Sequence, residues 1–209
     1  MDESKHIQLN EAKWDKWAES IDGKGFKYEY LRRAQNTLIS ILDIRENVHM
    51  LDIGCGTGRA LGQAAKLANG KGLFYGVDLS AKMIEKAKEN FKEGGNFHFV
   101  KSSSESIPLR NDLFEIIIST NSFHHYLNPG KAMNEIYRLL KPGGKVYILD
   151  PTADLLIVKI ANKIIKLFEP GHVKLYSTQE FKNFITGAGL KYAGCEAMHS
   201  TIKIHIGEK

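Results

Sequence analysis

The chain has 209 residues, 43% of them hydrophobic and 25% charged, which indicates a globular domain and excludes a disordered or fibrous chain. Its two cysteines, Cys55 and Cys195, exclude a disulfide framework and are too few for a zinc site, so we expect no metal. The net charge of +5 comes from lysines spread along helical segments, a pattern of solvated helix faces that argues against nucleic-acid binding.

The chain begins with two segments of helical periodicity. Residues 10–20 and 30–42 carry apolar side chains at three- and four-residue spacing, as amphipathic helices do. We expect residues 1–45 to form a helical cap on a single domain that covers residues 1–209. The charged start lacks the apolar core of a signal peptide, and no apolar run is long enough to span a bilayer, so the sequence predicts a cytoplasmic protein.

The stretch V-H-M-L-D-I-G-C-G-T-G-R (48–59) is the most informative part of the sequence. An apolar run typical of a buried strand breaks into three glycines at alternate positions, and a helix-forming segment follows at once. The backbone of such a turn can approach a ligand closely, because it lacks side chains there. A second apolar run, 72–77, ends in Asp78, a carboxylate suited to the hydroxyls of a ribose. The two features together predict an adenosine-containing cofactor.

Details of the turn narrow the class of cofactor. A dinucleotide-binding turn needs a small residue at its sixth position, where this chain has Arg59. A P-loop needs Gly-Lys-Ser/Thr after four variable residues, and Gly70-Lys71-Gly72 does not supply it. Asp52, just before the glycines, would repel a pyrophosphate but suits a ligand that carries an ammonium or sulfonium charge.

Strands and helices alternate through the rest of the chain. This alternation predicts a doubly wound α/β fold with a parallel sheet. Ser80 is suited to cap the helix that follows it, and Pro142 and the glycines after it should stop the helix before the fifth strand. The expected strands lie near 48–53, 72–77, 96–100, 114–119, 144–149, 191–198 and 201–206. The expected helices, besides the two in the cap, lie near 59–69, 80–92, 129–140, 153–168 and 178–187.

Four motifs resemble those of the class I S-adenosylmethionine (SAM)-dependent methyltransferases, in the small-molecule branch that is UbiE/methyltransferase-11-like. They are L-D-I-G-C-G-T-G (51–58), V-D-L-S (77–80) followed by Met83, S-E-S-I-P-L (104–109) ahead of L-F-E-I-I-I-S (113–119), and L-L-K-P-G-G-K-V-Y-I-L (139–149). The resemblance covers nearly the whole chain. It implies a Rossmann-like sheet of seven strands in the order 3-2-1-4-5-7-6, with the last strand antiparallel and helices on both faces. It also implies SAM as the methyl donor and S-adenosylhomocysteine as the product.

The resemblance also implies which residues hold the cofactor. Asp78 would accept from the ribose hydroxyls, and Asp52 would lie near the cationic end, directly or through water. Leu79 and Met83 would sandwich the adenine, although Met83 also suits a helix core. Many relatives carry an aspartate for the adenine amino group where this chain has Ser103, so the backbone of the next residue could hold the adenine instead. The expected cofactor residues are Asp52, Gly54, Cys55, Gly56, Gly58, Asp78, Leu79, Met83, Ser103, Ser104, Glu105 and Asn121.

The acceptor should lie beyond the fourth strand, where S-T-N-S-F-H-H-Y (119–126) follows and where ligands gather in open α/β sheets. His124 or His125 could remove a proton from the acceptor, or either could cap the next helix or pack against the cofactor. Trp17 is expected in the acceptor pocket, although packing between helices would also explain a tryptophan at this position. The residues expected to line the acceptor pocket are Trp17, Tyr28, Phe123, His172 and Tyr176.

Residues 153–176 are expected to form a lid whose apolar side covers the pocket. The segment 155–168 carries lysines opposite an apolar stripe, so contact with an anionic membrane surface is the alternative. Either use of the segment favours a partly apolar acceptor. The stripe consists of Ile157, Ile160, Ala161, Ile164, Ile165 and Phe168.

The function that follows is transfer of a methyl group from SAM to a small, partly apolar acceptor by in-line displacement. Two other classes stay open at this point. A regulatory protein would bind SAM without turnover and would keep the glycines and Asp78. A nicotinamide-dependent oxidoreductase would share the strand, turn and helix, but Arg59 and the terminal pair of strands argue against it.

Overall fold

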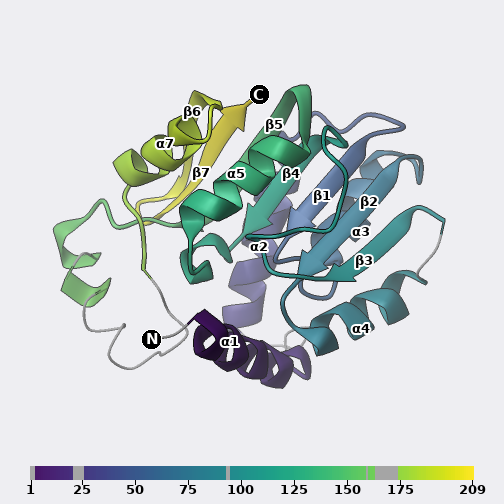
Figure 1. Ribbon diagram of the computed structural model, residues 1–209, viewed down its shortest axis with the longest axis horizontal. Coiled ribbons are helices and arrows are strands. Elements are labelled where there is room, and N and C mark those ends of the chain that lie inside the picture. The colour runs from purple at the N-terminus through teal and green to yellow at the C-terminus, as the bar shows by residue number, and fades with distance from the viewer. Residues whose placement is uncertain (1–2, 21–25, 93–94, 159, 163–173) are drawn as a thin grey trace.

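The computed structural model describes residues 3–20, 26–92, 95–158, 160–162 and 174–209. One seven-stranded sheet forms its centre, and helices pack on both faces (Figure 1). The strands are β1 His49–Ile53, β2 Leu73–Asp78, β3 Phe97–Lys101, β4 Phe114–Thr120, β5 Leu140–Pro151, β6 Lys191–His199 and β7 Ile202–Glu208. The helices are α1 Glu3–Ala18, α2 Phe26–Ile41, α3 Arg59–Leu67, α4 Ala81–Phe91, α5 Pro129–Leu139 and α7 Thr178–Gly187, with a 3-10 turn η1 Phe123–His125.

The strand order β3-β2-β1-β4-β5-β7-β6 confirms the predicted topology. Strands β1 to β5 pair in parallel, whereas β7 lies antiparallel between β5 and β6. The chain leaves β1 towards one edge of the sheet and β4 towards the other. The carboxyl ends of β1 and β4 therefore lie side by side at the switch point, where open α/β sheets bind their ligands.

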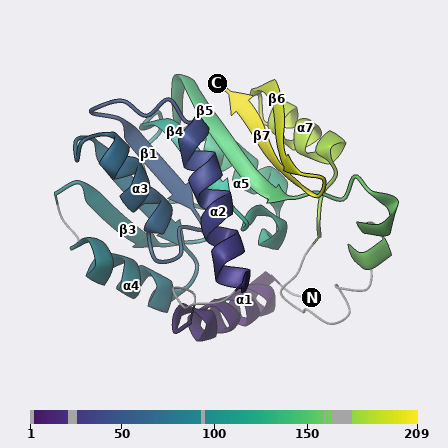
Figure 2. The ribbon, with the colours of Figure 1, turned by 180° about the vertical axis from the view of Figure 1, so that it is seen from behind.

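Both faces of the sheet are buried, as expected for parallel strands that consist of apolar runs. Neighbouring residues of β1 serve opposite faces, because side chains alternate along a strand. Met50 packs in the core that includes Leu38 of α2 and Leu61 of α3. Leu51 packs in the core that includes Ile136 of α5 and residues of α7. Figure 2 shows α2 and α3 over the first face, and Figure 1 shows α5 and α7 over the other.

The fifth strand is longer than the pattern predicts. It was expected over 144–149, but β5 begins at Leu140, directly after α5. Phe114 pairs with Leu140 and Ile116 pairs with Lys145, so the register shifts between these pairs. Gly143 has a φ of +77°, which a glycine adopts without steric cost. The proline and glycines therefore form an irregularity within the strand, which pairs on both sides of it.

The segment after β5 differs from the expected helix 153–168. Residues 156–158 and 160–162 are helical. Ala153 is not helical, and its backbone N–H donates to the Tyr176 carbonyl at 2.9 Å. The side chain of Asn162 bonds both backbone groups of Leu175, each at 3.0 Å, which ties the helical residues to the chain before α7. The rest of the expected helix, with Ile164, Ile165 and Phe168, lies outside the described residues.

Helix α1 lies along α4, next to the carboxyl ends of the strands (Figure 1). Its Asp15 accepts from the hydroxyl of Ser80, the residue that caps α4 by accepting from the Met83 N–H at 3.1 Å. Lys86 of α4 donates to the Ala18 carbonyl at 2.6 Å. These bonds hold the face of α1 that carries its tryptophans towards the ligand end of the sheet.

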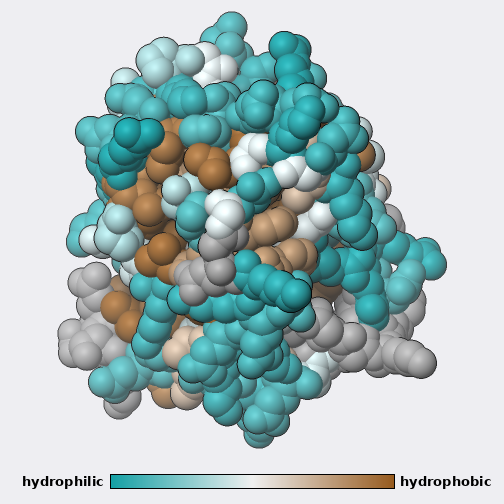
Figure 3. Space-filling model, turned by 90° about the vertical axis from the view of Figure 1, so that its right-hand side faces the viewer, coloured by the Kyte–Doolittle hydropathy of each residue, from teal (hydrophilic) through white to brown (hydrophobic). Residues whose placement is uncertain are grey.

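One edge of the sheet is formed by β3. Residues 102–113 lead from β3 to β4 as turns and bends without a helix. Tyr75 of β2 stacks on His98 of β3 with 4.6 Å between ring centroids and meets Phe114 edge-on at 5.3 Å. Figure 3 views this side of the molecule, where hydrophobic surface lies within a hydrophilic surround. The connection 102–113 begins beside the end of β2, so its first residues lie at the ligand end of the sheet.

Candidate functional site

A cavity of about 490 Å³ lies at the carboxyl ends of the strands. Residues from α1 and α2 form its outer side, and the ends of β1, β2 and β4 form its floor. Thirteen of the predicted site residues line it: Trp17, Gly54, Cys55, Gly56, Asp78, Leu79, Met83, Ser103, Ser104, Glu105, Asn121, His124 and His125. These residues come from segments that are far apart in the chain, and the sequence analysis had assigned them to one site.

The glycine turn after β1 has the left-handed backbone that its sequence requires. Gly54 has a φ of +79°, and a Cβ there would lie 2.5 Å from the hydroxyl of Ser122. The N–H groups of Gly54 and Cys55 both donate to the Val77 carbonyl, at 2.7 and 3.0 Å, which ties the turn to the end of β2. Gly58 does not line the cavity, because it is the N-cap residue just before α3 and its α-carbon faces the rings of Phe91 and Phe99.

Asp78 joins the two turns of the cavity floor. One carboxylate oxygen accepts from the backbone N–H of Gly56 and the other from that of Ser80, each at 2.9 Å. Burial raises the pKa of Asp78, and these N–H donors oppose that rise. A carboxylate has about four lone-pair sites, so each oxygen can still accept from a ligand hydroxyl.

The sequence led us to expect Asp52 near the cofactor. In the structure it lies behind the glycine turn and does not line the cavity. Its side chain is fully buried, because it projects from β1 to the same face as Met50. Neither carboxylate oxygen accepts a hydrogen bond from the described part of the chain. Burial, and then the charge of Asp78, raise the pKa of Asp52 to about 8.

The far end of the floor is formed by α4 and the start of the 102–113 connection. Met83 is buried and lines the cavity, so the helix-core and ligand-wall roles that its sequence position suggests coexist. The hydroxyl of Ser103 accepts from the Glu105 N–H at 3.2 Å. The Glu105 carboxylate in turn accepts from the backbone N–H of Asn128, at 2.8 Å, which ties this wall to the start of α5.

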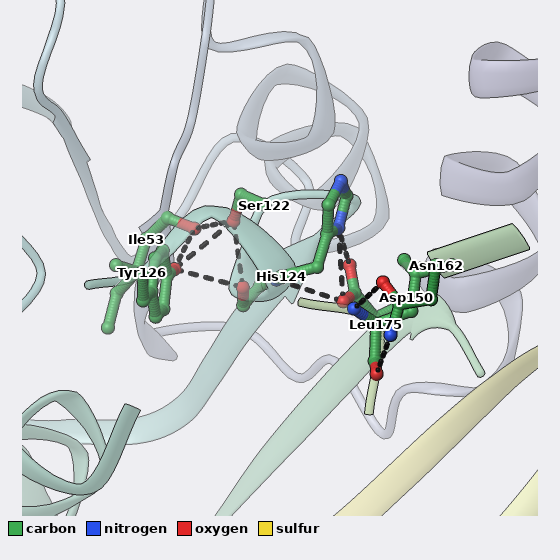
Figure 4. A network of polar contacts seen from close by, with 8 residues as sticks. Ile53, Ser122, His124, Tyr126, Asp150, Asn162 and Leu175 are labelled. Atoms are coloured by element: carbon green, nitrogen blue, oxygen red, sulfur yellow. Dashed lines mark hydrogen bonds and ion pairs between the residues drawn. The ribbon is translucent and has the colours of Figure 1, made fainter. Parts of the chain in front are cut away.

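His124 meets a buried carboxylate that the sequence analysis did not single out. Asp150, at the end of β5, accepts from the backbone N–H of His124 at 3.0 Å, and its Oδ1 lies 2.9 Å from the ring Nδ1 (Figure 4). Burial raises the pKa of Asp150, and the charge and hydrogen bonds of His124 oppose the rise. The sequence signal was available, since Asp150 ends an apolar strand at the ligand side of the sheet.

A buried hydroxyl network lies beside this pair (Figure 4). The Tyr126 hydroxyl is 3.0 Å from that of Ser119 and 3.1 Å from that of Ser122. The hydroxyls of Tyr126 and Ser122 both donate to the Ile53 carbonyl, at 3.1 and 3.0 Å. Ile53 directly precedes the glycine turn, and Ser122 and Tyr126 flank His124 in sequence. The network therefore fixes the position of η1 relative to that turn.

Aromatic side chains of α1 form the outer wall. Trp14 meets Trp17 edge-on at 5.3 Å and His125 edge-on at 4.9 Å between ring centroids. Polar residues of α1 and α2 join this wall at positions that the sequence analysis missed: Asn10, Lys13, Arg32 and Gln35. The helical spacing of 10, 13, 14 and 17 would have placed Asn10 and Lys13 on the face of α1 that carries the two tryptophans.

Two residues expected in the acceptor pocket lie elsewhere. Phe123 and Tyr176 are buried in the core under α5 and α7, where both pack against Phe181 with ring centroids 5.2 and 5.9 Å away. The side chain of Tyr28 and all of His172 lie outside the described residues. Ile157 and Ile160 of the expected lid stripe are 73% and 55% exposed, and neither lines the cavity. The lid stays a prediction.

Comparison with known proteins decides the family. The family model described as "Methyltransferase domain" matches residues 44–193, which is more than half of the chain. The chain belongs to the class I SAM-dependent methyltransferases. SAM is therefore the cofactor, and this methyltransferase is of the UbiE/methyltransferase-11 type.

The methyltransferase is 26% identical to the ubiquinone/menaquinone biosynthesis C-methyltransferase UbiE of Wigglesworthia glossinidia brevipalpis, over 84% of this chain and 67% of that protein. It is 30% identical to the uncharacterized methyltransferase YcgJ of Bacillus subtilis, over 74% of this chain and 62% of that protein. A Haloferax volcanii putative methyltransferase, solved in complex with the Trm112 activator, shares the fold with a TM-score of 0.79 and 19% identity, over 93% and 96% of the two chains. The chain thus spans about two thirds of the length of the first two relatives.

Within the described residues of this methyltransferase, no helix is long and apolar enough to cross a membrane. The same residues contain no group of three or more His, Cys, Asp or Glu side chains arranged to hold a metal ion.

Replacing Tyr126 with phenylalanine is expected to lower the free energy of unfolding of the methyltransferase by about 1–3 kcal/mol, because buried partners of its hydroxyl lose a hydrogen bond. Urea unfolding followed by circular dichroism measures this. Tyr137, which is partly exposed on α5, provides the matched Tyr→Phe control and should change stability by less than about 0.5 kcal/mol. Equal effects of the two substitutions would contradict the role of the network.

Proposed function

We propose that this methyltransferase transfers the methyl group of SAM to a small, partly apolar acceptor by in-line displacement. The observation that carries the proposal is one cavity in which ten of the twelve cofactor residues predicted from the sequence meet an aromatic wall and a histidine pair. The acceptor would lie between the glycine turn and Trp14, since that side of the cavity holds its indole ring and both histidines. Apolar lining there favours an acceptor with an apolar part.

The described residues fit the cofactor. Asp78 would bind the ribose hydroxyls with the lone pairs that its two backbone donors leave available. Met83 and Leu79 would contact the adenine, and Glu105, held by Asn128, would lie beside it. The turn at Gly54 would pass beneath the methionine portion, because a side chain there has no room.

SAM supplies an activated methyl group on a sulfonium, so the protein's main task is alignment. The hydroxyl network fixes the glycine turn relative to η1, and this holds the donor side of the cavity in place against the histidine side. Trp14 and Trp17 would exclude water from the reacting atoms. Exclusion of water favours a displacement in which the positive charge on sulfur disappears.

The proposal is tested by transfer of labelled methyl from SAM into a host-cell extract, followed by separation into organic, aqueous and macromolecular fractions. Wild-type protein should label one fraction. Trp14→Ala should lower the rate at limiting extract by about 10-fold or more, because an aromatic wall contributes about 1.5–3 kcal/mol, while SAM binding stays within about 2-fold. Tyr137→Ala, an aromatic truncation outside the cavity, is the control.

Either of two results would contradict the proposal. Label that appears equally with and without the protein would show that the protein does not catalyse the transfer. SAM binding without any transfer would favour the other reading of the fold, a regulatory protein that holds SAM. Label in the organic fraction would support the apolar acceptor.

A further inference from the structure

Asp150 is a carboxylate with no solvent exposure, and burial of a charge is costly unless hydrogen bonds compensate it. Its hydrogen bonds in the described chain all come from one residue. Its Oδ2 accepts the backbone N–H of His124 at 3.0 Å, and the ring Nδ1 lies 2.9 Å from Oδ1 and 3.1 Å from Oδ2. A buried carboxylate at the ligand end of the sheet is therefore devoted to orienting His124.

The geometry selects one form of the imidazole. A backbone N–H can only donate, so Oδ2 must act as an acceptor, as it does in a carboxylate. When the carboxyl is ionised, Oδ1 can also only accept, so the ring nitrogen that faces it must carry a proton and donate it. In the neutral ring this places the proton on Nδ1 and leaves Nε2 as the basic nitrogen. His124 lines the cavity.

The ring of His125 lies beside that of His124, with 3.9 Å between the ring centroids, but it is His124 that bonds to Asp150. Tyrosines also lie near the pair. Tyr30 of α2 has a raised pKa, because of burial and then the charge of Asp150. Burial, and then Glu180 and Asp150, raise the pKa of Tyr176 to about 12. Burial also raises the pKa of Tyr126. None of these hydroxyls would ionise near neutral pH. Of the two neighbouring imidazoles, His124 is the one that a carboxylate orients, so His124 is the group suited to accept a proton.

We propose that the acceptor presents a hydroxyl group of phenol or enol type, and that His124 is its general base, with Asp150 as the positioning residue. This inference rests on the proposed function. The hydroxyl gives its proton to Nε2 as its oxygen bonds the methyl carbon and the bond from that carbon to sulfur breaks. The products are a methyl ether, neutral S-adenosylhomocysteine and a His124 imidazolium, which is stabilised by Asp150 and returns its proton to water.

The choice of a hydroxyl follows from what each acceptor needs. A carboxylate arrives without its proton, and a thiol, with a pKa of about 8.5, is partly ionised at neutral pH. A phenol-like hydroxyl has a pKa of about 10 and keeps its proton, so a base within the cavity changes its rate most. General bases of this kind contribute about 100- to 10,000-fold to a rate.

Asp150→Asn is the deciding variant. The amide oxygen can still accept the backbone N–H of His124, but the amide N–H₂ can only donate to Nδ1, which moves the ring proton to Nε2. Two-bond ¹⁵N correlation spectra, with His124→Gln used to assign the signal, should show the proton on Nδ1 in wild type and on Nε2 in the variant. A wild-type proton on Nε2 would overturn the inference, whatever the activity.

The same proteins are then compared in transfer of labelled methyl to host-cell extract. Asp150→Asn should lower kcat by about 100-fold or more while SAM affinity stays within about 2-fold, and the lost rate should partly return at high pH, where the acceptor ionises by itself. Asp154→Asn is the control, since Asp154 pairs with Lys203 and does not line the cavity. The labelled product should survive alkali, which removes methyl esters, and release labelled methyl iodide in hydriodic acid.

Three results have different meanings. No transfer by the wild type would contradict the proposed function itself. Transfer by the wild type that Asp150→Asn leaves unchanged would overturn the inference and leave the proposed function standing. Label that hydriodic acid does not release would lie on carbon. That result would overturn the hydroxyl acceptor and leave the proposed function standing.

Discussion

Asp78→Ala is expected to weaken SAM binding by about 100-fold or more. Two charge-assisted hydrogen bonds to the ribose would be lost, at about 1.5–3 kcal/mol each, and 1.4 kcal/mol corresponds to a factor of ten in the dissociation constant. The N–H groups of Gly56 and Ser80 would also lose their acceptor, which would loosen the turn that contacts the cofactor. Titration calorimetry with SAM measures the affinity.

The control for this substitution is Asp43→Ala. Asp43 is an exposed aspartate that pairs with Arg45 and does not line the cavity, so its loss should leave SAM affinity unchanged. Thermal unfolding of both variants shows whether the fold is kept. An Asp78→Ala protein that folds and binds SAM within about 3-fold of wild type would show the ribose assignment to be wrong.

Asp52→Asn is expected to stabilise the protein and to weaken SAM binding. The pKa of Asp52 is about 8 in the folded protein, where burial raises it, and 3.8 for an ordinary aspartate, so the unfolded chain loses this proton first as pH rises. Between these values the folded state binds more protons, and stability falls as pH rises through that window. An amide does not ionise, so the variant avoids this loss.

The stability gain should therefore depend on pH. Near pH 4 the two proteins should unfold at similar temperatures, and near pH 8 the variant should be more stable by about 1 kcal/mol or more, or about 2–4 °C in Tm for each kcal/mol. Differential scanning calorimetry at several pH values measures this difference. A Tm difference that stays constant from pH 4 to pH 8 would contradict the raised pKa.

The effect on SAM has the opposite sign. A cationic ligand above the glycine turn favours the ionised form of Asp52, so binding should release a proton and should strengthen as pH rises towards 8. Asp52 lies behind the turn, and its charge would act across it. Calorimetry in buffers of different ionisation enthalpy measures the released proton. Asp52→Asn should release fewer protons and bind SAM about 10-fold more weakly at pH 8.5, the equivalent of one pKa unit.

These two carboxylates show how far the sequence reaches into the site. Both were expected at the cofactor from their places beside apolar strands. Asp78 lines the cavity, because it ends β2, where the backbone turns towards the ligand. Asp52 is still within β1, and the alternation of side chains along a strand points it into the face that α2 and α3 cover.

Segment 119–126 shows the same limit more sharply. The sequence analysis placed the whole segment at the end of β4, but the side chains of a 3-10 turn do not all point the same way. Phe123 turns into the core, while His124 and His125 line the cavity. Adjacent positions in a turn share a location without sharing a direction, so the pattern alone could not separate them.

The fold, the strand order and the cofactor could all be predicted before the structure was known. Strand runs, glycine turns and helix caps are local signals, and the four motifs resemble those of the methyltransferase family, which implied the strand order that the sheet has. Which side chains meet in the site could not be predicted in this way. The pairing of His124 with Asp150, and of Tyr126 with the Ile53 carbonyl, joins positions 26 and 73 residues apart. Such contacts depend on how neighbouring strands end together, and no spacing within one segment encodes that.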